Sequence, residues 1–223
     1  MKTAIVVFPG TNCDYDTQYA CEMMGSKTEF VWHKETALPK ETDLVILPGG
    51  FSYGDALRSG SIARFSPVMK SVIDFAGKGG KVLGICNGFQ ILLESRLLPG
   101  AMKRNANLHF ISKHHHLKVV ENDNDFLKAL KSGDIVNIPI AHGEGNYYID
   151  DENLQKLYDQ GQVLLTYCDA EGNPLNPNGS VDAIAGICNR EKNVFGLMPH
   201  PERAMETLLG SADGVSMLAG LFR

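Results

Sequence analysis

The sequence predicts an α/β protein: a mostly parallel central sheet with helices on both faces, hence three layers, to which antiparallel strands are added. Short apolar runs alternate with amphipathic stretches through the first half of the 223-residue chain, which is the pattern of β–α–β units. Two of these runs, 44–47 and 82–85, are apolar almost throughout, as expected of strands buried on both faces. The second half alternates apolar and polar residues with few helical stretches, which indicates antiparallel strands.

The expected elements follow the chain in order. In the first half we expect strands at 4–8, 28–32, 44–47 and 81–85 and helices at 15–25 and 66–78. In the second half we expect strands at 109–120, 134–141, 162–167, 183–188 and 194–198 and a last helix that begins after Pro201. The turn-rich loop 171–180 is too short for a domain linker, so residues 1–223 are expected to form a single domain.

Composition excludes several classes of partner and location. The net charge is −5 and no basic cluster is present, so nucleic acid is not expected as a partner. No apolar run approaches the ~20 residues that span a bilayer. The five cysteines are odd in number and form no C-x-x-C pair, which favours reduced thiols in a cytoplasmic protein and no metal site.

The segment 81–94 carries the sharpest local signal, because it places a cysteine between two glycines where a buried strand meets a helix. Gly84-Ile85-Cys86-Asn87-Gly88 has the form of a nucleophile elbow. Side chains at the glycine positions would clash in so tight a turn, which should push the sulfur of Cys86 into the open. The positive end of the following helix favours the thiolate.

The alternative for Cys86 is a small apolar residue packed at a strand end, as most cysteines are. The flanking glycines and the position at the end of a strand favour the nucleophile. The other four cysteines lack this setting and are expected to be structural; they are Cys13, Cys21, Cys168 and Cys188.

A nucleophile of this kind needs an oxyanion hole. One donor is expected to be the backbone N–H of Asn87, and a second can come from the loop Pro48-Gly49-Gly50, which ends the strand 44–47. Parallel strands bring their carboxyl ends to the same edge of a sheet, so this loop and Cys86 can face each other. Such donors are typically worth ~3–4 kcal/mol each.

Two histidines are candidates for the general base, and each is followed two residues later by a glutamate. His142 and Glu144 flank Gly143, while His200 and Glu202 flank Pro201. Proline fits the first turn of a helix, which favours His200 as a strand-to-helix junction residue, but the local sequence leaves both candidates open. The histidine triplet 114–116 is expected to be a solvated strand rather than a ligand set.

These motifs resemble those of class I glutamine amidotransferases, whose fold is flavodoxin-like. The elbow resembles their nucleophile signature, Pro48-Gly49-Gly50 their oxyanion loop and 199–202 their histidine–glutamate pair. More narrowly, the segments 51–58, 62–67, 139–145 and 176–180 are similar to those of the small glutaminase subunits of phosphoribosylformylglycinamidine synthases. The resemblance covers nearly the whole chain and is weakest around 121–132.

The resemblance implies a role for each matching residue. Cys86 would attack the side-chain amide of L-glutamine to give a γ-glutamyl thioester, with His200 as base and Glu202 orienting it. The backbone N–H groups of Gly50 and Asn87 would form the oxyanion hole. Gly49 and Gln90 would contact the substrate, and His142 and Glu144 would face a partner. The resemblance thus favours His200 over His142, which spacing alone did not.

The resemblance also implies partners. Ammonia would pass to a large synthetase subunit, with a small accessory subunit in the same complex, and that synthetase would use ATP and Mg²⁺ to convert formylglycinamide ribonucleotide to formylglycinamidine ribonucleotide in purine biosynthesis. This chain has no Walker-type phosphate loop, so no cofactor is expected in it. The alternatives are a stand-alone cysteine hydrolase, such as a γ-glutamyl hydrolase, and a catalytically inert interaction subunit.

Overall fold

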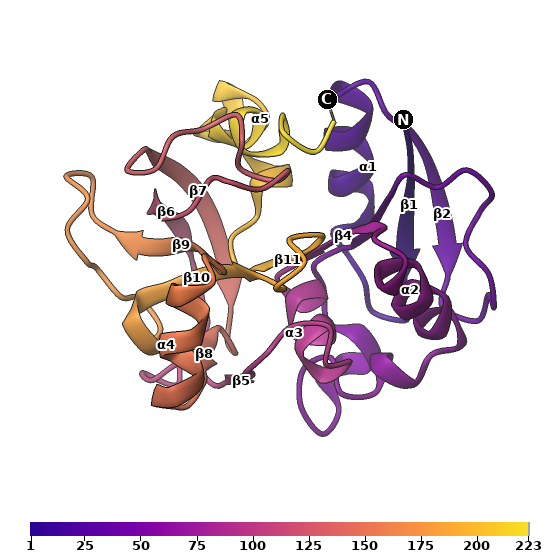
Figure 1. Ribbon diagram of the computed structural model, residues 1–223, viewed down its shortest axis with the longest axis horizontal. Helices are drawn as coiled ribbons and strands as arrows, with labels where there is room; N and C mark the ends of the chain where they lie inside the picture. Colours follow the sequence, from indigo (N-terminus) through magenta and orange to yellow (C-terminus); the bar gives the residue numbers. More distant parts are fainter. Residues whose placement is uncertain (223) are drawn as a thin grey trace.

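The computed structural model describes residues 1–222 and contains a sheet of nine strands that runs through both halves of the chain (Figure 1). The strands lie in the order β2-β1-β3-β4-β11-β10-β9-β6-β7. Their bounds are β1 (Lys2–Val7), β2 (Lys27–Trp32), β3 (Leu44–Leu47), β4 (Lys81–Ile85), β6 (Ile111–Val119), β7 (Ile135–His142), β9 (Val163–Cys168), β10 (Ile184–Cys188) and β11 (Val194–Leu197). A separate pair consists of β5 (Ala101–Lys103) and β8 (Asn146–Tyr148).

Helices cover both faces of this sheet, which confirms the three-layer α/β prediction. They are α1 (Asp14–Met23), α2 (Pro67–Gly77), α3 (Asn87–Glu94), α4 (Asp151–Asp159) and α5 (Asp213–Leu218). In Figure 1, α1 and α5 lie on one side of the central strands β4 and β11, and α3 lies on the other. Among the described residues, no helix combines the length and the apolar character needed to cross a membrane.

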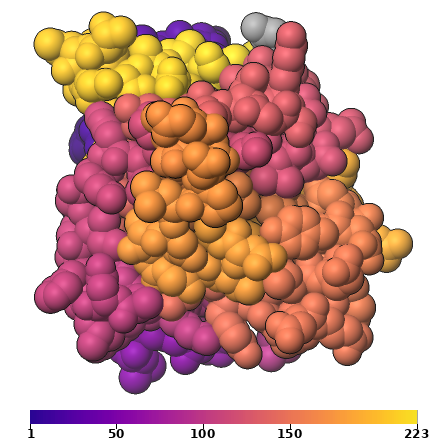
Figure 2. All heavy atoms as spheres, turned by 90° about the vertical axis from the view of Figure 1, so that its left-hand side faces the viewer, coloured from indigo at the N-terminus to yellow at the C-terminus, as the bar shows by residue number. Residues whose placement is uncertain are grey.

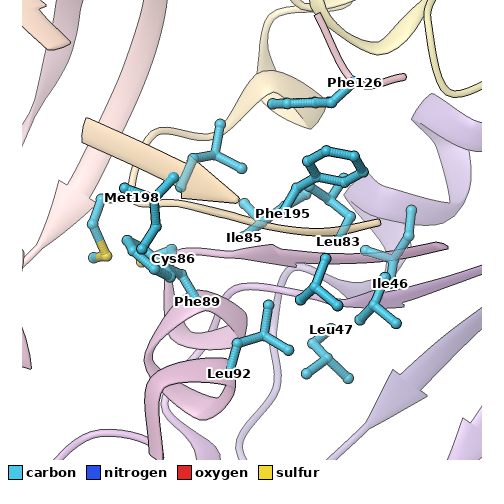
Figure 3. Close-up of a cluster of buried hydrophobic side chains, with 14 of the residues drawn as sticks. Ile46, Leu47, Leu83, Ile85, Cys86, Phe89, Leu92, Phe126, Phe195 and Met198 are labelled. Carbon is cyan, nitrogen blue, oxygen red and sulfur yellow. The ribbon is translucent and has the colours of Figure 1, made fainter. Parts of the chain in front are cut away.

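The core explains why the central strands are apolar throughout. All four residues of β3 are buried, and so are the last four of β4. Figure 3 shows Phe126 and Phe195 on one side of β4 and β11, with Phe89 and Leu92 of α3 on the other. Burial of a large apolar side chain contributes about 1.5–3 kcal/mol, so a strand packed on both faces holds the edge that carries the site firmly in place.

The sheet divides into a parallel part and an antiparallel part, and one strand differs from expectation. Parallel pairings join β2, β1, β3, β4 and β11 in that order, whereas antiparallel pairings join β11, β10, β9, β6 and β7. We expected β11 among the added antiparallel strands. One edge of β11 pairs in parallel with β4, and its other edge pairs antiparallel with β10. β11 therefore belongs to both the parallel and the antiparallel part of the sheet.

Two helices also differ from the sequence-based expectation. The helix expected after Pro201 is only a short 3₁₀ turn, Pro201–Arg203, and α5 begins at Asp213. α4 was not expected at all, although Asp150 caps it by accepting a hydrogen bond from Asn153 N at 3.0 Å. Figure 2 shows a face built largely by the second half of the chain, where the orange atoms of residues around 150–190, α4 among them, form much of the surface.

Candidate active site

Cys86 occupies the turn between β4 and α3 and has the strained backbone of an elbow, with φ 50° and ψ −104°. The flanking glycines are required sterically. A Cβ at Gly84 would lie 2.7 Å from backbone atoms of Gly88, and a Cβ at Gly88 would lie 1.9 Å from the carbonyl oxygen of Leu47. Strain of this kind persists only where the surrounding packing enforces it. The predicted elbow is therefore confirmed in its geometry.

The exposure of Cys86 differs from expectation. Its side chain is only 5% exposed, because the segment 139–145 covers the turn and the Ala141 carbonyl lies 3.7 Å from Sγ. The sulfur is still accessible from within, since Cys86 lines two neighbouring cavities of about 260 and 240 Å³. The nucleophile sits where these two cavities meet, enclosed rather than open.

His200 and Glu202 form a buried pair beside this sulfur. Nδ1–H of His200 donates to Oε1 of Glu202 at 2.6 Å, and each residue is 2% exposed. Burial alone would lower the pKa of His200, but the negative charge of Glu202, together with the neighbouring Cys86 and Cys13, outweighs it and holds this pKa well above its ordinary value. Nε2 has no hydrogen-bond partner of ordinary geometry among the described residues. The pair thus leaves Nε2 available for proton transfer.

His142 is placed differently from the partner-facing position that we expected. Its side chain is 3% exposed, and Nε2 accepts a hydrogen bond from Asn178 Nδ2 at 2.9 Å. Burial, followed by the charge of His200, lowers the pKa of His142 to about 4. The nearby carboxylate of Glu144 hydrogen-bonds Ser59 instead. His142 is therefore a neutral, buried wall of the larger cavity and has no carboxylate to orient it as a base.

The oxyanion loop lies against the elbow as expected. Gly50 lines both cavities together with Cys86, and Ser52 N donates to Asn87 Oδ1 at 3.1 Å, which ties the loop to the start of α3. Gly49, which we predicted to contact the substrate, lies against the imidazole. A Cβ there would lie 2.7 Å from Cε1 of His200 and 2.9 Å from Sγ of Cys13, so this glycine makes room for the imidazole.

The larger cavity carries the polar groups expected of a substrate pocket. Gln90 lines it, donating through Nε2 to the Glu144 carbonyl at 2.7 Å and accepting from Asn87 Nδ2 at 2.9 Å. Glu144 and Asp55 line it as well. Burial, together with the charge of Glu144, raises the pKa of Asp55 to about 6. The cavity therefore holds a nucleophile beside a cluster of oxygen and amide groups.

Comparison of this chain with known proteins identifies its family. The CobB/CobQ-like glutamine amidotransferase domain matches residues 1–214. The curated phosphoribosylformylglycinamidine synthase subunit PurQ of Sulfurimonas denitrificans is 67% identical over 223 residues, the whole of both chains. That of Wolinella succinogenes is 60% identical over 221 residues and 99% of each chain. This chain belongs to the PurQ family of glutamine amidotransferases.

A solved structure agrees with this assignment. The structure of PurLQS from Thermotoga maritima matches with a TM-score of 0.89 and 41% identity, covering 99% of this chain and 96% of that chain. The resemblance drawn from the motifs is thus confirmed, both for the glutamine amidotransferases and for the PurQ family within them. The stand-alone hydrolase and the inert subunit are not favoured.

Sequence reasoning missed several residues that the PurQ fold brings to the site. Cys13, classed as structural, lies against His200, and Arg203 donates to its sulfur at 3.2 Å. Ser59 and Asp55 line the larger cavity. Only Arg203, one residue beyond Glu202, carried a local signal. The others come from loops whose position depends on the whole sheet.

Proposed function

We propose that this PurQ-family chain is the glutaminase subunit of a phosphoribosylformylglycinamidine synthase. It hydrolyses L-glutamine to glutamate and ammonia through a thioester on Cys86. The observation that carries this proposal is the strained Cys86 turn beside a buried imidazole–carboxylate pair, His200 and Glu202, at one cavity. A thiol, a base and a group that orients the base are the parts that acyl transfer to cysteine requires.

The proposed reaction begins with proton transfer from the Cys86 thiol to Nε2 of His200. The thiolate sulfur then attacks the side-chain carbonyl carbon of glutamine, and the carbonyl oxygen becomes an oxyanion that accepts hydrogen bonds from backbone N–H groups of Gly50 and Asn87. Collapse of this intermediate breaks the C–N bond, and the imidazolium gives its proton to the departing nitrogen as ammonia leaves. Glu202 stabilises the imidazolium, consistent with the raised pKa of His200.

Deacylation uses the same groups in the reverse sense. Nε2 of His200 takes a proton from water, whose oxygen attacks the thioester carbon. The C–S bond then breaks, and the departing thiolate takes the proton back from the imidazolium, which regenerates the Cys86 thiol and the neutral imidazole. The burial of His200 and Cys86 supports both half-reactions, because charge–dipole interactions are stronger where bulk water is excluded.

The amino-acid end of glutamine is proposed to occupy the larger cavity. Its α-ammonium group would find the carboxylates of Asp55 and Glu144, and Gln90 would hold the substrate from α3. The cavity volume of about 260 Å³ suits one small amino acid.

The proposed partners come from the names of the relatives. We place this chain in a complex with a large synthetase subunit, which would use ATP and Mg²⁺ to turn formylglycinamide ribonucleotide into formylglycinamidine ribonucleotide with the ammonia delivered, and with a small accessory subunit. The cysteines of the described residues are all unpaired, which fits a cytoplasmic enzyme.

Labelling with diazo-oxo-norleucine, a glutamine-mimicking electrophile, followed by peptide mapping, tests the site. We expect modification at Cys86 that L-glutamine blocks and that His200→Ala slows, while His142→Ala leaves it far less affected. Labelling that glutamine does not block would support a generic cysteine hydrolase. No labelling of Cys86 in the assembled complex would support an inert subunit. Equal labelling of the wild type and His200→Ala would refute the choice of base.

A further inference from the structure

A second thiol lies against the catalytic pair. One ligand atom each from Cys13, His200 and Glu202 (the sulfur, an imidazole nitrogen and a carboxylate oxygen) all lie within 4.8 Å of one another. Cys13 ends the loop after β1, whereas the other two residues come from the turn after β11. Each of the three side chains is 2% exposed. The fold therefore assembles a buried Cys–His–Glu cluster that the proposed reaction uses only in part.

Two polar atoms of this cluster have no partner. Nε2 of His200 and Oε2 of Glu202 are buried without a hydrogen bond among the described residues. Buried polar atoms without partners are unfavourable and rare, so each indicates a ligand of the site. Substrate and water account for Nε2 during turnover, but the proposed mechanism gives Oε2 nothing to bind.

We propose that Cys13, His200 and Glu202 bind Zn²⁺ and that the bound ion reversibly switches off the glutaminase. Thiolate, imidazole and carboxylate are the ligand types that Zn²⁺ takes, typically three from the protein with a fourth position open to water. Ligand atoms of a tetrahedral Zn²⁺ site lie roughly 3.5 Å apart at the usual bond lengths. The widest separation in the cluster, 4.8 Å at most, therefore has to shrink to about 3.5 Å, and the 2.6 Å between His200 and Glu202 has to widen to it.

The charges around the cluster and the access to it both permit Zn²⁺ binding. The thiol gives up its proton when the sulfur–metal bond forms, and the proton that Nδ1 of His200 donates to Glu202 moves to Nε2, so that Nδ1 can bind the ion beside that carboxylate. Cys13 and Glu202 together then supply two negative charges to the divalent ion. Burial raises the pKa of the Cys13 thiol, so the metal has to displace its proton. Arg203, which donates to the Cys13 sulfur at 3.2 Å, opposes this effect of burial, while Asp16 accepts from Arg203 Nε at 2.9 Å and offsets its positive charge. The 240 Å³ cavity is lined by Cys13 and His200 and gives the ion a place to enter.

The effect on catalysis follows from the ligands, and only this part of the inference rests on the proposed function. An ion held by His200 and Glu202 occupies the imidazole and carboxylate that the reaction needs for proton transfer. The spacing of cysteines along the sequence predicted no metal site. Folding joins ligands that are far apart in the chain, which no local motif reveals.

Cobalt(II) is the probe for the binding itself, because a cobalt–thiolate bond gives a charge-transfer absorption band that cobalt bound by nitrogen and oxygen lacks. The full-length reduced chain is titrated with Co²⁺ as the wild type and as Cys13→Ala, Cys13→Ser and Cys86→Ala. Cys21→Ala is the matched control, since Cys21 is a buried cysteine outside the cluster. We expect the band to persist in Cys86→Ala and Cys21→Ala and to vanish in both Cys13 variants, with Co²⁺ affinity at least about tenfold weaker.

The opposite pattern overturns the proposal. A band that persists in the Cys13 variants and vanishes in Cys86→Ala places the metal on the catalytic cysteine alone, and a wild type without a band has no thiolate site. Ammonia release by the assembled complex is then measured against Zn²⁺, each variant relative to its own metal-free rate. We expect the Cys13 variants to need at least about tenfold more Zn²⁺ for half-inhibition. Binding without inhibition would leave the metal site standing and refute its role as a switch.

Discussion

At the residue scale, the chemistry depends on the 2.6 Å hydrogen bond between His200 and Glu202. Sequence reasoning could name this pair, because both residues lie within three positions of each other beside a proline. It could not choose between His200 and His142 from spacing, since each has a glutamate two residues on. The structure separates them physically: Glu202 turns toward its histidine, whereas Glu144 turns toward Ser59.

Glu202→Gln tests the electrostatic part of this pair. The amide keeps the shape of the side chain but removes the negative charge that raises the pKa of His200. We expect that pKa to fall and thioester formation on Cys86 to slow by about 10²–10⁴-fold. Single-turnover labelling of the complex as a function of pH measures both effects. A variant with the wild-type rate and pH profile would show that Glu202 does not act through its charge.

His142 should make folding stability depend on pH. Its pKa is about 4 in the folded chain and ordinarily about 6.5 when unfolded. Between these two pH values the unfolded state binds the proton and the folded state does not. The folded state therefore keeps its full stability with respect to His142 above pH 6.5 and loses unfolding free energy as the pH falls toward 4. Lowering the pH from 7.5 to 5 should cost about 2 kcal/mol of unfolding free energy through this group.

His142→Gln isolates that contribution from opposing groups. The raised pKa of Asp55, about 6, has the opposite sign, because the folded chain gains that proton first as the pH falls. Urea unfolding of the wild type and His142→Gln at both pH values gives the difference directly. We expect the variant to lose about 2 kcal/mol less than the wild type over this range. Equal losses would mean that His142 is protonated in the folded state.

At the scale of elements, apolar runs located the strands well because burial on both faces leaves a continuous hydrophobic signal. The direction in which neighbouring strands pair leaves no such signal in the sequence. The residues of β11 are as apolar as those of the parallel strands, yet its two edges pair in opposite senses. α4 was missed because only Leu157 among its residues is buried, so the apolar stripe that marks most helices is nearly absent.

The elbow itself is an element whose sequence requirement can be measured. Gly88→Ala would place a Cβ 1.9 Å from a backbone oxygen of Leu47, and neither strand nor helix can move without disrupting the core. We expect a loss of at least about 4 kcal/mol in unfolding free energy, or failure to fold.

Gly77→Ala is the matched control for that variant, because it lies at the end of α2 and a Cβ there meets nothing within 4 Å. Alanine should stabilise this position by up to about 1 kcal/mol, since glycine is the poorer helix former. Chemical denaturation of both variants supplies the comparison. A Gly88→Ala variant as stable as Gly77→Ala would show that the turn does not need glycine.

At the scale of the whole molecule, we propose that residues 1–223 are a single domain, since one sheet joins both halves of the described chain. The site draws on both: Cys86 follows β4, and His200 follows β11 beside it. Sequence could place each group at the end of a strand but not in the same cavity. That closeness comes from the pairing of β4 with β11, which brings distant parts of the chain to one edge.

The mouth of the larger cavity leads to a prediction about the isolated chain. Apolar side chains border it and remain exposed: Phe51 by 46%, Leu108 by 76% and Phe110 by 54%. The loop that follows Gly50 holds Tyr53, Asp55 and Leu57 in left-handed conformations, which are strained for such residues. We propose that a synthetase subunit covers this apolar rim and brings the oxyanion loop to its active geometry.

The isolated chain should therefore hydrolyse glutamine slowly, and the synthetase should raise kcat/KM by at least about tenfold. Ammonia release is measured with and without the partner subunit from the same organism, its substrate and ATP. Leu108→Ser should weaken this activation more than it changes the rate of the isolated chain, because Leu108 lies at the mouth, whereas the buried reacting groups Cys86 and His200 lie inside. If the chain alone turned over glutamine as fast as the reconstituted complex, the oxyanion loop would already be competent and the rim would have no part in activating it.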